Sequence, residues 1–165
     1  MNHIDHPTCR QRDGSPARSA WILALFCLLG SGGCATKVPY TPQLDAVDRQ
    51  GPPKAMEELV AVVQRVLLPR VIAESVKATE EHLVYDYVPE WHYYWYWFAI
   101  DTGPKTIAWA VLDRIDLYDN NRVFMYGAGG YELGWLHFHS REDAMTFIDL
   151  ALSLAARWKA ARRPG

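Results

Sequence analysis

The sequence lacks an excess of positive charge, which argues against binding to nucleic acid. Its 165 residues include 17 Lys and Arg against 19 Asp and Glu. Proteins that bind nucleic acids carry clusters of Lys and Arg that neutralise phosphates and release counterions. Outside its last few residues, this chain has no such cluster interleaved with aromatic residues. We therefore expect no nucleic-acid partner.

The sequence also lacks the motifs that mark common catalytic sites. It contains no Gly-x-Ser-x-Gly elbow and no His-Glu-x-x-His motif. The glycine-rich segment 127–130 has no following Lys-Ser/Thr and lies between expected strands, so we interpret it as a turn. Asp113, Asp116 and Asp119 cannot share one face of a strand, which favours solvent-side or turn positions over paired carboxylates. We expect neither enzyme activity nor catalytic residues.

The support for a metal site is weak. His137 and His139 lie two residues apart in an expected strand and so point the same way, with His92 as a candidate third ligand. No acidic residue is in register with the pair on that strand. We therefore interpret them as solvent-facing or half-buried histidines, and we expect no bound metal and no cofactor.

A hydrophobic run long enough for a permanent transmembrane helix is missing as well. The apolar run Trp21–Leu29 has nine residues and would span only about 14 Å as a helix, under half of the roughly 30 Å hydrocarbon core. It comes after Arg10, Arg12 and Arg18, and small residues follow it. This order is typical of a signal peptide, which we expect over residues 1–33.

The residues after that run indicate lipid attachment. Segment 30–36 reads Gly-Ser-Gly-Gly-Cys-Ala-Thr. It resembles the lipobox of bacterial prolipoproteins, in which a small residue precedes an invariant cysteine. Gly32, Gly33 and Cys34 match that pattern, whereas Ser31 lies where the family usually has Leu. The resemblance implies cleavage before Cys34, a diacylglycerol on its sulfur and acylation of the new amino terminus.

Cysteine is otherwise scarce. Cys9 and Cys27 lie in the expected leader, so the processed chain would keep only Cys34 and form no intramolecular disulfide. Ala35 follows Cys34, whereas in enteric members of the lipoprotein class an Asp there favours retention in the inner membrane. The resemblance therefore implies a bacterial membrane lipoprotein that faces the periplasm, in the outer membrane rather than the inner, held by acyl chains on Cys34.

The remaining chain divides into a linker and a domain. Residues 34–53 contain four prolines and no apolar periodicity, which predicts an extended linker. Residues 54–165 suffice for a single α+β domain. A helix that opens at Pro52 has apolar residues at three- and four-residue steps, and Pro69 stops it.

Turn signals and apolar patterns then predict an antiparallel meander of about six strands. We expect these over residues 71–78, 82–87, 91–100, 106–118, 122–126 and 131–139. Ser140, with Asp143 three residues on, resembles a capping box and introduces a long amphipathic C-terminal helix. This order loosely resembles pleckstrin-homology-like domains over roughly residues 71 to 160, which implies a bent sheet plugged by that helix. The alternative is an α+β layer with helices on one face of the sheet.

The segment 91–98 is the most unusual feature of the sequence. As a strand it would place Trp91, Tyr93, Trp95 and Trp97 on one face and further aromatic residues on the other. Burial of the strand on both faces, between sheet and helix, is the favoured interpretation. The alternatives are an interaction surface for a partner or ligand, since Trp and Tyr are enriched at such sites, and contact with the membrane interface.

The sequence as a whole favours a lipid-anchored, non-catalytic envelope module that binds another envelope protein or supports an assembly. A second hypothesis is a small-molecule or lipid carrier, with the aromatic strand lining a pocket. The third hypothesis is an enzyme whose site is assembled from distant residues.

Overall fold

The computed structural model describes residues 35–88 and 104–162. The chain divides into two units, Met1–Cys34 and Ala35–Gly165, and all described residues belong to the second. Cys34 lies outside them, and so do Trp91, Tyr93, Trp95 and Trp97. Within the described ranges, no helix has the length and the apolar character that crossing a bilayer requires.

Three helices are described: α2 (Ala46–Gln50), α3 (Pro52–Gln64) and α4 (Arg141–Ala161). The predicted N-terminal helix is confirmed at its start, where Pro52 occupies a first-turn position that lacks a helical partner for its N–H anyway. Its predicted end near Pro69 is wrong, because residues 66–68 pair with another strand instead of continuing the helix. The long C-terminal helix is confirmed, with Ser140 as its N-cap.

The main sheet is antiparallel and has five strands in the order β1-β8-β9-β10-β2. Its members are β1 (Lys37–Val38), β2 (Val66–Leu68), β8 (Leu112–Tyr118), β9 (Arg122–Gly127) and β10 (Glu132–Phe138). The turn between β9 and β10 falls on the glycine-rich segment, as expected. There Gly129 has φ +84 and Gly130 has φ +82, which residues with a Cβ rarely adopt.

Two smaller sheets complete the β-structure. The first pairs β3 (Arg70–Val71) with β6 (Tyr87–Val88), and the second contains β4 (Lys77–Ala78), β5 (His82–Tyr85) and β7 (Lys105–Ala108). The described residues therefore form ten short strands, although about six were expected. The α+β class with mostly antiparallel strands is confirmed.

Part of the difference in strand number has local causes. The expected strand 71–78 is interrupted by a 3₁₀ turn, η1 (Ala73–Ser75), where the Ser75 hydroxyl donates to the Ile72 carbonyl at 2.6 Å. The expected strand 106–118 is broken after residue 108, where Trp109 turns into the core. Its ring is fully buried and its Nε1 donates to the Thr79 carbonyl at 2.9 Å.

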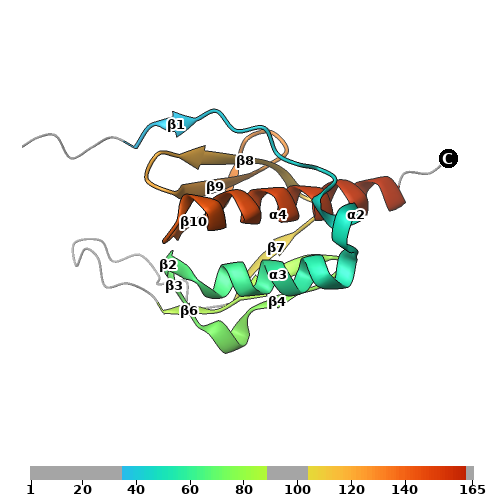
Figure 1. The fold of residues 1–165 in the computed structure, drawn as a ribbon, viewed down its shortest axis with the longest axis horizontal. Helices are drawn as coiled ribbons and strands as arrows, with labels where there is room; N and C mark the ends of the chain where they lie inside the picture. Colours follow the sequence, from blue (N-terminus) through green and yellow to red (C-terminus); the bar gives the residue numbers. More distant parts are fainter. Residues whose placement is uncertain (1–34, 89–103, 163–165) are drawn as a thin grey trace, which may run out of the picture. The chain divides into compact units, whose positions relative to one another are not determined.

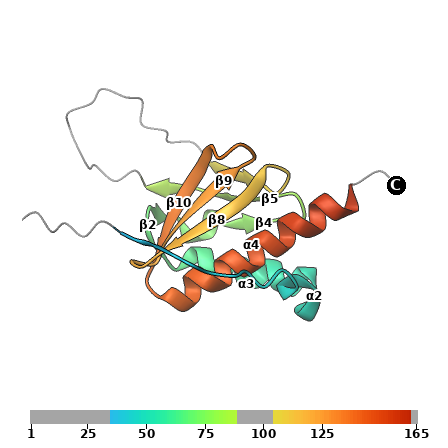
Figure 2. The ribbon, with the colours of Figure 1, turned by 90° about the horizontal axis from the view of Figure 1, so that it is seen from above.

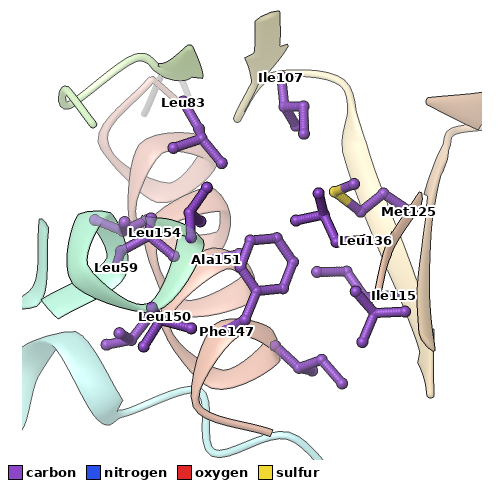
Figure 3. Packing of buried hydrophobic residues seen from close by; sticks show 14 of the residues in the cluster. Leu59, Leu83, Ile107, Ile115, Met125, Leu136, Phe147, Leu150, Ala151 and Leu154 are labelled. Atoms are coloured by element: carbon purple, nitrogen blue, oxygen red, sulfur yellow. The ribbon is translucent and has the colours of Figure 1, made fainter. Parts of the chain in front are cut away.

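The helices and the strands form two layers. Helices α3 and α4 pack side by side and lie on one side of the strands (Figures 1 and 2). This is the arrangement of the alternative α+β layer, and it departs from a sheet plugged by one C-terminal helix. Between the layers, Phe147 and Ala151 of α4 face Leu136 of β10 and Leu59 of α3 (Figure 3).

The expected linker is partly folded. Residues 36–47, here called the N-terminal segment, lie along β8 and α4 instead of extending into solvent. The carbonyl of Thr36 accepts a hydrogen bond from the Asp119 N–H at 3.0 Å, and Lys37 and Val38 pair with β8. The side chain of Val47 is fully buried. The domain therefore begins well before residue 54, because tertiary contacts compensate for the missing local periodicity.

Candidate functional site

The face of the main sheet that points away from the helices is the candidate functional site, here called the outer face. Directly opposed residues on antiparallel strands share a face. Val123 and Met125 of β9 are buried against the helices, so the residues between them and their partners lie on the other side. The outer face comprises Arg114, Asp116 and Tyr118 of β8, Arg122, Phe124 and Tyr126 of β9, and Trp135 and His137 of β10.

Aromatic rings form the centre of the outer face. The centroids of Tyr118 and Phe124 are 5.0 Å apart in an edge-to-face arrangement, and those of Phe124 and Trp135 are 6.5 Å apart. All three side chains are half-buried. Such pairs contribute roughly 0.5–1.5 kcal/mol beyond the area that they bury. Because neighbouring rings hold one another, the face presents a pre-ordered apolar surface.

Cations lie over two of the rings. The Arg114 guanidinium is 4.6 Å from the centroid of Tyr126, and that of Arg122 is 5.6 Å from the centroid of Trp135. Burial raises the pKa of Tyr126 above its usual value, and the nearby Tyr118 and Asp116 raise it further. The Tyr126 phenol therefore stays neutral at physiological pH and keeps its proton for hydrogen bonding.

Asp116 is buried on this face, which corrects the expectation that it lies on the solvent side or in a turn. Its side chain is 2.8 Å from the Lys37 ammonium and 3.1 Å from Arg114 Nε. Two cations thus neutralise one carboxylate whose residue is only 7% exposed. Asp113 and Asp119 are exposed, as expected.

Arg122 and His137 oppose each other in register at one end of the outer face. Arg122 Nε and His137 Nδ1 are both buried and make no hydrogen bond. Among the ion pairs of residues 35–88 and 104–162, none includes Arg122. Since a buried donor without an acceptor is costly, the Arg122 guanidinium is the group of this face that gains from an oxygen acceptor.

Burial lowers the pKa of His137 below its usual 6.5, and the positive charges of Arg122 and His139 lower it further. A hydrogen bond with the Asn120 backbone acts in the opposite direction. His137 is half-buried and His139 is exposed. Across the part of the chain that the structure describes, no three His, Cys, Asp or Glu side chains are grouped to hold a metal ion. His92, the candidate third ligand, lies outside those residues.

A second candidate is an open, mostly apolar groove between the N-terminal segment and the C-terminal half of α4. It has a volume of about 530 Å³ and is lined by residues of both segments and of β8, among them Leu44, Leu112, Leu152 and Ala155. Lys159 crosses it and donates to the Leu112 carbonyl at 2.7 Å. No aromatic side chain lines this groove, in contrast to the aromatic pocket of the carrier hypothesis.

Of the residues singled out from the sequence, Asp116 and His137 belong to the outer face. The structure places neither Cys34 nor the four aromatic residues of segment 91–97, which lie outside the described residues. Sequence reasoning missed the outer face, although its signal is present. Polar or aromatic residues alternate with apolar ones along 122–126 and 135–139, and this pattern marks a strand with one side turned away from the core.

Comparison with known proteins adds no relative, since no family model, no curated protein and no solved structure matches this chain. The resemblance to pleckstrin-homology-like domains therefore gains no support. The residues and the geometry of the outer face therefore carry the functional inference.

Proposed function

We propose that this chain is a lipid-anchored bacterial envelope lipoprotein whose domain is a non-catalytic binding module, and that it binds another envelope protein through the outer face. The observation that carries the proposal is a set of half-buried aromatic rings beside Arg122, which makes no ion pair among the described residues, on the side of the sheet that no described helix covers. Binding of this kind requires no cofactor.

The composition of the outer face suits a protein partner. Tyr, Trp and Arg dominate the binding energy of protein interfaces, and they do so where they are well packed and desolvated. The rings of Phe124 and Trp135 are already held by neighbours, so little side-chain freedom is lost on binding. The Arg122 guanidinium favours a partner that presents a carboxylate or another oxygen acceptor at that end.

The proposed anchor rests on Cys34 and on the leader that precedes it. Metabolic labelling with an alkyne fatty acid tests it, in wild-type cells and in cells that carry Cys34→Ala. We expect label on the wild type, none on the variant, and wild-type protein in the outer-membrane fraction. Unlabelled wild-type protein would overturn the anchor, and labelled protein in the inner membrane would overturn the outer-membrane assignment.

The proposed interface is tested by photo-crosslinking in cells. A benzophenone amino acid replaces Tyr118 on the outer face or, as a control, the exposed Lys54 on α3. We expect an adduct with a discrete envelope protein at position 118 and none at position 54. Adding Arg122→Glu should lower the yield of the adduct about tenfold, which corresponds to a loss of about 1.4 kcal/mol in binding free energy. Equal adducts at both positions, or an adduct that ignores Arg122→Glu, would refute the outer face as the interface.

The apolar groove gives the carrier hypothesis a specific alternative. Leu152→Trp would fill the groove beside α4 without touching the outer face. If the chain were a carrier, the wild-type protein would bind a fluorescent fatty acid and Leu152→Trp would not. Arg122→Glu would bind this probe as the wild type does. We expect no binding of this probe to either protein, since the groove is open and Lys159 crosses it.

A further inference from the structure

The chain is fixed to the domain almost directly after Cys34. The carbonyl of Thr36 accepts a hydrogen bond from the Asp119 N–H. Lys37 then pairs with Tyr118 and Val38 with Leu117. Ala35 is thus the sole residue between Cys34 and the first residue that is bonded to the sheet.

The rest of the N-terminal segment is held as firmly. The Tyr40 phenol donates to both carboxylate oxygens of Asp149 at 2.9 Å. Burial and that carboxylate raise the pKa of Tyr40 to about 12, so the donating proton is retained at physiological pH. Further along, the Val47 N–H donates to the buried Ser153 hydroxyl at 3.2 Å. Because contacts hold both ends of the N-terminal segment, its local unfolding into a free linker is unfavourable.

We propose that the domain is held against the membrane by a defined end, the end of the main sheet that carries the β8–β9 turn, residues 119–121. The inference rests on the proposed lipid anchor at Cys34, and the partner surface is a phospholipid bilayer. Cys34 and Thr36 are two residues apart in the chain, so the distance between their Cα atoms is at most about 7.6 Å. A tether this short leaves the domain little freedom to turn another end toward the lipid.

The direction of the strands determines what lies at each end. Strand β8 runs toward Tyr118, and its antiparallel neighbours place Arg122 of β9 and Phe138 of β10 at the same end. Figure 2 shows the first described residues of the N-terminal segment, β2 and the connection from β10 to α4 together at that end. The turn 128–131 between β9 and β10 lies at the other end, about 20 Å away along six residues of β9.

The test uses the absence of any other cysteine after Cys34. Asp119→Cys and Ala128→Cys introduce single thiols at exposed positions in the two turns, and the Asp119 backbone bond to Thr36 does not involve the replaced side chain. Each protein, purified in its acylated form after cleavage before Cys34, is labelled with a small fluorophore. It is then placed in vesicles of phosphatidylethanolamine and phosphatidylglycerol that contain lipids with a nitroxide quencher on the headgroup.

We expect quenching at position 119 to be at least about threefold stronger than at position 128, because the two turns are roughly 20 Å apart. Inserting twelve Gly and Ser residues between Ala35 and Thr36 adds a tether of about 20 Å, and quenching at the two positions should then become equal. Equal quenching without the insertion, or a difference that survives it, would overturn the inferred orientation.

Failure of the anchor is recognised separately. The thioether on an acylated Cys34 does not react with maleimides, whereas a free Cys34 does. If the wild-type protein takes up the fluorophore, the anchor and the orientation are both wrong. If it stays unlabelled and carries fatty acid while positions 119 and 128 are quenched equally, only the orientation is wrong.

Discussion

Ser153 and Asp116 are the two polar side chains that the described core buries, and both have their hydrogen-bonding or charge partners within the domain. The Ser153 hydroxyl donates to the Leu44 carbonyl at 2.7 Å and accepts from the Val47 N–H at 3.2 Å. Arg122 and His137 on the outer face differ, since each keeps a buried nitrogen without a partner. At the scale of single residues, this contrast separates polar groups whose bonding is complete within the domain from groups whose bonding is incomplete.

Replacing Ser153 with Ala should lower the free energy of unfolding by about 1–3 kcal/mol, because it leaves the buried Val47 N–H and the partly buried Leu44 carbonyl without this partner. Urea denaturation followed by circular dichroism measures the change. Thr146→Ala, at a partly exposed position of the same helix, is the control and should change stability by no more than about 0.5 kcal/mol. Equal effects of the two substitutions would contradict the bridging role of Ser153.

Replacing Arg122 with Gln should raise the pKa of His137, because it removes the positive charge that disfavours the imidazolium. In the wild type the pKa of His137 is below its ordinary 6.5, so the unfolded chain takes up a proton first as pH falls. Stability should therefore fall as pH drops from 6.5 toward the pKa of His137 in the folded protein, and it should fall less in the variant.

Titration of the His137 ring by NMR measures the change in its pKa. Arg114→Gln is the control. Arg114 is not among the charges that shift the pKa of His137, so this substitution should leave that pKa unchanged.

At the scale of elements, the start of α4 is joined to the end of α3. The Asp143 N–H donates to the Ser140 hydroxyl at 3.0 Å, as expected of an N-cap. The Asp143 carboxylate accepts from Arg65, the residue that follows α3, at 2.5 Å. Because Arg65 is half exposed, water screens this pair and its contribution is under about 1 kcal/mol. It still aligns the two helices that cover the sheet.

The hydrogen bond from Arg65 lowers the pKa of Asp143 below its ordinary 3.8, and that from Ser140 lowers it further. A carboxyl group with a lowered folded pKa stabilises the fold above the ordinary value, and this contribution is lost as pH falls through the folded pKa. The stability difference between wild type and Asp143→Asn should thus be constant from pH 7 to about pH 5 and shrink below pH 4. Thermal unfolding at these pH values measures it. A difference that persists at pH 2 would argue against the ion pair.

At the scale of the whole molecule, the boundary of the domain depends on contacts between residues that are far apart in sequence. Tyr40 reaches Asp149 and Val47 reaches Ser153, in each case across more than 100 residues. These contacts make residues 36–47 part of the folded unit.

A chain that starts at Lys54 should therefore be less stable than one that starts at Ala35, by at least about 3 kcal/mol. Burial of Val47 contributes roughly 1.5–3 kcal/mol, and the hydrogen bonds of Tyr40 and Ser153 contribute about 1 kcal/mol each. Guanidinium unfolding of the two chains compares them. Indistinguishable midpoints would restore the boundary at residue 54 and make the N-terminal segment a linker after all.

Much of the fold is predictable from local signals. The start of α3 follows from two adjacent prolines, the start of α4 from Ser140 and Asp143, and the turn at 128–130 from its glycines. These signals act over three or four residues, so no knowledge of the rest of the chain is needed. The outer face was only half predictable, since alternation along β9 and β10 shows that two faces exist but not which side the helices cover.

The sequence by itself determined the α+β class, the two long helices, the antiparallel hairpins and the features that indicate a lipid anchor at Cys34. Tertiary structure alone decided that residues 66–68 become a strand, that Asp116 is buried between two cations and that residues 36–47 lie on α4. Each of these depends on a partner contributed by a distant part of the chain. Elements of two to five residues are too short to form without such a partner, because their own few hydrogen bonds do not offset the backbone entropy lost in ordering them.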